Sequence, residues 1–166
     1  MWRGEQIEFW LRENGRPTMG AELGVARGRF TAHMLGAFRG LHMVAVDLWS
    51  VTTGNPQYEN WPVDEHYDAF LFVCECFPGL VTLVRSDTAA AATQFADQSF
   101  DFVFVDGDHR YEGVRRDIVA WQPKVRLGGM LCGHDYTPRY PGVMQAVDEI
   151  GRRVITGEDY CWMVRA

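Results

Sequence analysis

The sequence predicts an α/β fold in which a doubly wound, mostly parallel sheet is flanked by helices. Short apolar runs alternate with longer segments of helical spacing, as is typical of strands joined by crossover helices. Polar residues follow several of these runs, where the carboxyl ends of parallel strands would lie. A chain of 166 residues suits one domain, so we expect residues 1–166 to form a single domain.

Five apolar runs are the predicted strands, and their length is that of strands rather than helices. They are residues 19–25, 42–49, 80–86, 100–106 and 128–136.

The predicted helices carry apolar residues three or four positions apart. This spacing occurs at Phe30, Met34 and Phe38 and within residues 70–77, 114–121 and 143–150. The N-terminal segment IEFWLREN predicts a further short helix that covers the sheet. No chemistry is assigned to that segment.

Composition excludes several classes of function. No apolar run approaches the roughly 20 residues that cross a bilayer, and the start MWRGEQIEFW lacks a signal-peptide core. A formal net charge of -6 argues against a general binder of nucleic-acid backbones, which need clustered Lys and Arg. We therefore expect a cytoplasmic protein with neither a membrane nor a nucleic acid as its partner.

The four cysteines are Cys74, Cys76, Cys132 and Cys161. None falls in a CxxC pair, and each has apolar neighbours, so we expect buried free thiols rather than a zinc site or disulfides.

The segment ELGVARGRF after the first predicted strand has the glycine spacing of a tight turn that opens a helix. Gly24 and Gly28 would let backbone amides approach a ligand, as in nucleotide-binding loops. The G-x-G-x-x-G fingerprint of dinucleotide binding is absent. Asp47, at the end of the second strand, could accept both hydroxyl hydrogens of a ribose. Asp87 follows the third strand, where the adenine of a bound nucleotide would lie.

A second polar segment follows the fourth predicted strand in FDFVFVDGDHRYEG. Asp106, Asp108 and His109 come directly after apolar residues. Removing carboxylates from water at this place costs free energy unless a bound group or partner compensates for it, so we expect these residues to have a function. His134 and Asp135 follow the fifth strand in the same way.

The order ELGVARG, VAVDLW, VRSD, FVFVDGDHRYEGVRRDI and GGMLCGHDY resembles the class I S-adenosylmethionine-dependent methyltransferases. Within them it is similar to the small-molecule O-methyltransferase branch typified by macrolide-sugar O-methyltransferases and cephalosporin hydroxylase-like proteins. The likeness runs from about Met19 to the C-terminus. It implies a Rossmann-like fold and methylation of a hydroxyl on a small molecule, such as a sugar or natural product.

The resemblance implies a set of residues that bind S-adenosylmethionine. Glu22 and Gly24 would hold the methionine portion, Asp47 the ribose, and Asp87 would lie near the adenine. The whole cofactor set is Glu22, Gly24, Gly28, Asp47, Asp87 and Asp106.

The metal-dependent relatives also imply a site for Mg²⁺ or Mn²⁺, here formed by Asp106, His134 and Asp135. His134 departs from the pattern, which usually has a carboxylate, and an imidazole suits Mn²⁺, Fe²⁺ or Zn²⁺ better than Mg²⁺. Adjacent residues of a straight strand point to opposite faces, so both can bind one ion only if the backbone bends. His134 could instead cap a loop or pack beside Tyr136.

The resemblance implies that His109 is the general base, because imidazole exchanges a proton near neutral pH. Its alternative role is that of a loop residue beside Arg110. Asp108 either orients His109 or faces water.

Residues 49–67 form the predicted lid or substrate loop, since loops of this length usually have a function. The loop contains Trp49, Tyr58, Trp61 and Tyr67, which could contact a ring or pack onto the domain or a partner subunit. We expect Trp49 and Tyr136 to contact the acceptor. The sequence is also compatible with a homo-oligomer.

Two other functions are alternatives to methyl transfer. The first is a catalytically silent module that binds a cofactor or nucleotide, since a fold does not prove a reaction. The second is an aspartyl-phosphate phosphatase with Asp106 as its nucleophile, although such enzymes place their Asp-x-Asp pair on the first strand.

Overall fold

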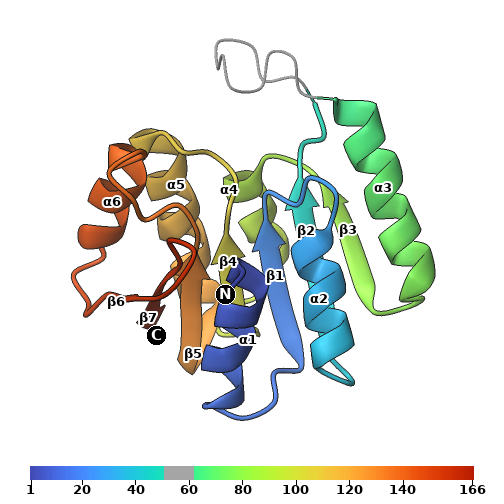
Figure 1. The fold of residues 1–166 in the computed structure, drawn as a ribbon, viewed down its shortest axis with the longest axis horizontal. Helices are drawn as coiled ribbons and strands as arrows, with labels where there is room; N and C mark the ends of the chain where they lie inside the picture. Colours follow the sequence, from blue (N-terminus) through green and yellow to red (C-terminus); the bar gives the residue numbers. More distant parts are fainter. Residues whose placement is uncertain (51–61) are drawn as a thin grey trace.

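The structure is a computed structural model that describes residues 1–50 and 62–166. Its described residues form a central sheet in the order β3-β2-β1-β4-β5-β7-β6 (Figure 1). The strands are β1 Met19–Leu23, β2 His42–Asp47, β3 Val81–Arg85, β4 Phe100–Val105, β5 Val125–Gly133, β6 Ile155–Thr156 and β7 Trp162–Arg165. The five predicted strands are therefore confirmed, with small changes at their ends.

Parallel pairing dominates the sheet, as the sequence predicts. β1 pairs in parallel with both β2 and β4, and the pairs β2 with β3 and β4 with β5 are also parallel. β7 is antiparallel to β5, and β6 to β7. From β1 the sheet is extended by β2 and β3 on one side, and the chain then adds β4 and β5 on the other side of β1. The carboxyl ends of β1 and β4 therefore lie at a topological switch point.

Helices cover both faces of the sheet (Figure 1). They are α1 Arg3–Arg12, α2 Arg29–Ala37, α3 Val63–Cys76, α4 Thr88–Ala91, α5 Tyr111–Trp121 and α6 Pro141–Asp148. The side chains of α1 and α2 share one core cluster, whereas those of α4, α5 and α6 share another. None of the described helices is both long and apolar enough to cross a membrane.

β4 supplies side chains to both core clusters because successive residues of a strand point to opposite faces. Phe102 and Phe104 lie in the cluster with α1 and α2, and the ring of Phe104 stacks on Phe30 at 3.9 Å. Val103 and Val105 lie in the cluster with α5 and α6. Each fully buried side chain of this kind stabilises the fold by roughly 1.5–3 kcal/mol, so β4 is held firmly beneath the residues that follow it.

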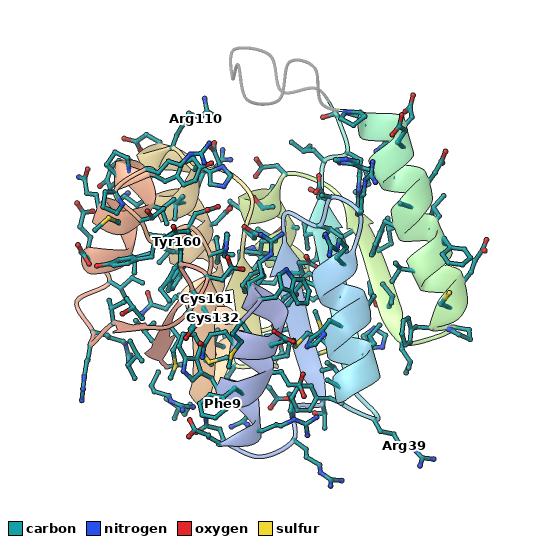
Figure 2. The ribbon with its side chains drawn as sticks, viewed as in Figure 1. Phe9, Arg39, Arg110, Cys132, Tyr160 and Cys161 are labelled. Atoms are coloured by element: carbon teal, nitrogen blue, oxygen red, sulfur yellow. The ribbon has the colours of Figure 1, made fainter. Side chains whose placement is uncertain are left out.

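The cysteine prediction is only partly correct. All four thiols are free, and Cys132 and Cys161 are buried in the core cluster beside α1 and α2 (Figure 2). Cys76 is exposed and Cys74 half-buried, because α3 covers the outer strands with one face only and Cys76 ends that helix.

The predicted loop 49–67 is shorter than expected at its C-terminal end, because α3 already begins at Val63. Residues 51–61, with Tyr58 and Trp61, lie outside the described residues.

Candidate active site

A cavity of about 550 Å³ lies at the carboxyl ends of the strands. This volume lies within the range of small-molecule sites. The predicted residues that line it are Glu22, Gly24, Asp47, Trp49, Asp87, Asp106, His109, His134 and Asp135. Gly28 and Tyr136 do not line it.

The glycine loop forms the floor of this cavity. Gly24 has a positive φ of 85°, and a Cβ there would lie 2.5 Å from the carbonyl oxygen of Asp106. Its backbone N–H donates to the carbonyl of Val46 at 2.9 Å. Only glycine therefore lets the exit of β1 pass this close to the exits of β2 and β4. Gly28, also at positive φ, is the N-cap of α2.

Asp47 binds the backbone of the glycine loop. Its Oδ2 accepts hydrogen bonds from the amides of Val25 at 2.8 Å and Ala26 at 3.0 Å, and its Oδ1 accepts one from the amide of Trp49 at 2.8 Å. The carboxylate thus organises the loop as well as facing the cavity, where its remaining lone pairs can accept ribose hydroxyls.

Glu22 is 2% exposed and accepts hydrogen bonds from the hydroxyl and backbone N–H of Thr31. Burial raises the pKa of Glu22 to about 8. At neutral pH this group is therefore largely a neutral acid whose proton can be lost when a cationic ligand approaches.

Asp87 has two partners in the structure. Its Oδ1 caps α4 by accepting from the amide of Ala90 at 2.9 Å, and its Oδ2 accepts from Arg116 at 2.7 Å. The carboxylate lines the cavity at the end where the adenine was expected.

Asp117 is a buried carboxyl group that the sequence reasoning missed. It lies on α5, and its Oδ1 accepts a hydrogen bond from the hydroxyl of Thr88, which lines the cavity, at 2.6 Å. Burial raises the pKa of Asp117 to about 7. A sequence signal for Asp117 does exist. It is an acidic residue within the apolar stripe of α5, which is formed by Val114, Ile118 and Trp121.

The structure brings Asp106, His134 and Asp135 together. His134 Nδ1 lies 3.6 Å from Asp106 Oδ1 and 3.2 Å from Asp135 Oδ1. Asp135 has a positive φ of 63°, and this is the backbone bend that lets two adjacent side chains face the same point.

The surroundings shift the pKa values of the three side chains in different directions. Burial raises the pKa of Asp106 to about 6. Burial also lowers the pKa of His134, but hydrogen bonding to Asp135 and the charge of Asp106 outweigh this effect, so the pKa is raised. For Asp135, burial is outweighed by hydrogen bonds from His109 and His134, which lower its pKa.

This donor set fits a divalent ion. One ligand atom from each of the three residues can be chosen so that all lie within 4.8 Å of one another. Ligand atoms around one small ion, at roughly 2.0–2.2 Å from it, are about 3 Å apart, close to the distances around His134 Nδ1. One nitrogen and two carboxylate oxygens suit Mn²⁺ better than Mg²⁺.

Arg3 is a second residue that the sequence reasoning missed. It begins α1, lines the cavity, and places Nε 3.5 Å from Asp106 Oδ2 and Nη1 3.5 Å from His134 Nδ1. An arginine at the start of an amphipathic helix normally faces solvent, so no local pattern would have revealed it.

His109 contacts Asp135, with Nε2 and Oδ2 2.5 Å apart. Its ring stacks on Tyr140 at 4.5 Å between centroids. Asp108 instead pairs with Arg110, at 2.7 Å from Nη2. Asp135 is therefore the carboxylate that orients His109.

The two predicted acceptor contacts lie in different places. Trp49 is 3% exposed, stacks on Phe70 at 5.1 Å and donates from Nε1 to the carbonyl of Ala26, yet it also lines the cavity. The Tyr136 hydroxyl donates to Asp148 at 2.7 Å, away from the cavity. Among the described residues, the tyrosine in the cavity wall is Tyr140, which no sequence pattern had indicated.

The fold and the site define a class of protein, a methyltransferase with a class I, Rossmann-like fold. Residues 21–136 match a family described as a methyltransferase domain, and the chain belongs to that family. The family implies S-adenosylmethionine as the methyl donor. This membership gives no support to the aspartyl-phosphate alternative.

Solved structures agree with this fold. The O-methyltransferase NovP is 19% identical, with a TM-score of 0.71 over 98% of this chain and 78% of that one. CalS11, a TDP-rhamnose 3'-O-methyltransferase of calicheamicin biosynthesis, is 18% identical, with a TM-score of 0.63 over 96% and 77%. A protein from Corynebacterium glutamicum is 16% identical, with a TM-score of 0.71 over 98% and 79%. No curated protein matches the sequence.

Proposed function

We propose that this methyltransferase transfers a methyl group from S-adenosylmethionine to a hydroxyl of a small molecule, such as a sugar or natural product. The single observation that carries the proposal is the cavity in which the glycine loop and Asp47 lie next to the pair His109 and Asp135. The similarity to NovP and CalS11 favours a hydroxyl acceptor.

The cavity residues suit the methyl donor. Loop amides and the Asp47 carboxylate present donors and acceptors for the ribose, and Glu22 offers a carboxyl group for the amino end of the methionine portion. Thr88 and Asp87 line the same cavity, and we expect the adenine to bind beside them. When bound, S-adenosylmethionine supplies a sulfonium methyl that is already activated for transfer.

The catalytic work left to the protein is alignment, exclusion of water and removal of one proton. His109 takes the hydroxyl proton, and the Asp135 carboxylate 2.5 Å away stabilises the imidazolium that forms. Stacking on Tyr140 holds the imidazole plane. Asp106, His134 and Asp135 would hold a divalent ion, which would bind acceptor oxygens and lower their pKa.

A two-stage experiment tests the proposal. Calorimetry with S-adenosylhomocysteine should show binding, and a panel of sugars and phenolic or polyketide alcohols, with and without Mn²⁺, should yield a methylated product. Absence of binding would refute the proposed cofactor. Binding without turnover on any acceptor would favour the catalytically silent module.

A further inference from the structure

We infer that Arg3 is a built-in counter-ion of the Asp106, His134 and Asp135 cluster, and that it lowers the affinity of the cluster for a divalent ion. The inference rests on the metal-binding part of the proposed function. It assigns a role in metal affinity to a residue of α1, outside the matched family segment 21–136.

The guanidinium of Arg3 lies against the ligand atoms themselves. Nε is 3.5 Å from Asp106 Oδ2, and Nη1 is 3.5 Å from His134 Nδ1, the nitrogen that faces both carboxylates. An ion shared by these ligands would lie within a few ångströms of a permanent positive charge. Two cations at such a distance repel each other, and screening by salt is weak where the groups are partly buried.

The fold holds Arg3 at this place. Its backbone N–H donates to Asp159 Oδ2 at 2.8 Å, and the side chain of Gln6, one turn further along α1, accepts from the amide of Glu158 at 3.0 Å. The connection between β6 and β7 therefore anchors the first turn of α1 beside the cluster. Neither anchor uses the side chain of Arg3, so both survive replacement of that side chain.

The charges around the guanidinium explain why an arginine is tolerated there. The guanidinium pairs with the carboxylate of Asp106 after β4. His134, which it also contacts, lies in turn 3.2 Å from Asp135 after β5 and 3.7 Å from Asp159 before β7. Among the residues that the structure describes, Arg3 Nε has no hydrogen-bond partner. The guanidinium is thus held beside the cluster by its charge, in the ion pair with Asp106, and it stays close to the place that an ion would take.

Removal of the charge should therefore strengthen metal binding. Mn²⁺ alone is the probe, titrated into the metal-free full chain and followed by the electron paramagnetic resonance signal of the free ion. Arg3→Met, which keeps an unbranched stem but removes the charged guanidinium, should bind Mn²⁺ at least about tenfold more tightly than the wild type, because one unit of like charge is lost nearby. Arg3→Lys, which keeps the charge, should stay within about threefold of the wild type.

Two controls locate the effect. Arg116→Met removes the same charge from the other side of the cavity, where Arg116 pairs with Asp87, and its Mn²⁺ affinity should stay within about twofold of the wild type. Asp106→Asn added to Arg3→Met should remove the gain, because it deletes a ligand. Arg3→Gln serves as a second uncharged variant, and thermal melting checks that each variant is folded.

An affinity of Arg3→Met and Arg3→Gln equal to or weaker than that of the wild type would overturn the inference, and so would an equal gain in Arg116→Met. Binding of S-adenosylhomocysteine by the wild type is measured in parallel. If the wild type did not bind S-adenosylhomocysteine, the proposed function would be contradicted, whereas the Mn²⁺ affinities of the variants could still be compared.

Discussion

Gly24→Ala tests whether the close contact between the exits of β1 and β4 is what shapes the cavity floor. A methyl group at this position would lie 2.5 Å from both the carbonyl oxygen of Asp106 and Cα of Gly107. Both atoms belong to backbone, so neither can turn aside as a flexible side chain would. The substitution therefore has to push the Asp106 segment away from β1.

The expected cost has two parts. A residue with a Cβ in a left-handed conformation loses roughly 1–2 kcal/mol, and overpacking adds about 1–3 kcal/mol. The sum of about 2–5 kcal/mol is a large part of the roughly 5–15 kcal/mol that stabilises a typical domain. For a chain of this length it corresponds to a fall of roughly 4–20 °C in melting temperature.

The assay is urea unfolding followed by circular dichroism, with S-adenosylhomocysteine calorimetry on the same samples. Gly36→Ala is the matched control, since a methyl group there meets no described atom within 4 Å and the position lies inside α2. It should raise the unfolding free energy by about 0.5–1 kcal/mol and leave ligand binding unchanged. A Gly24→Ala protein within about 0.5 kcal/mol of the wild type, with normal affinity, would show that our reading of this contact is wrong.

Three further predictions concern individual side chains. Asp47→Ala should weaken S-adenosylhomocysteine binding by roughly 1.5–3 kcal/mol in calorimetry, because it removes charged hydrogen bonds to the glycine loop and ribose; unchanged affinity would remove Asp47 from the site. His109→Ala should bind the cofactor almost normally yet lose ~10²–10⁴-fold in turnover, and a loss of only a few fold would end its assignment as the base. The pKa of Asp117 in the folded chain, about 7, lies above ~3.9 in the unfolded chain. The ionisation of this one group should therefore remove up to roughly 4 kcal/mol of folding free energy as the pH rises from about 4 to 7. Asp117→Asn, which can still accept the Thr88 hydrogen bond, should gain stability relative to the wild type between pH 5 and 8 in urea unfolding, and a constant difference would contradict this.

The sequence by itself determined the parallel strands β1 to β5, the helices that join them apart from the short α4, and the edge of the sheet at which the site lies. These features depend on local periodicity and on polar residues after apolar runs, which a single chain displays directly. Asp47 at the end of β2 and Asp106 after β4 lie in the cavity wall for this reason. Two adjacent residues at the end of a strand can face one point only if the backbone bends there, and the positive φ of Asp135 supplies this bend.

Only the tertiary structure decided which partners these residues have. Arg3 reaches Asp106 and His134 because the β6–β7 connection anchors α1 there. Asp135, not the nearby Asp108, orients His109. The β6–β7 hairpin itself went unpredicted, since two short strands at the end of a chain carry little periodic signal. Propensity and pattern act over a few residues, whereas an ion pair or a buried contact depends on packing between elements that are distant in sequence, and no local spacing encodes that distance.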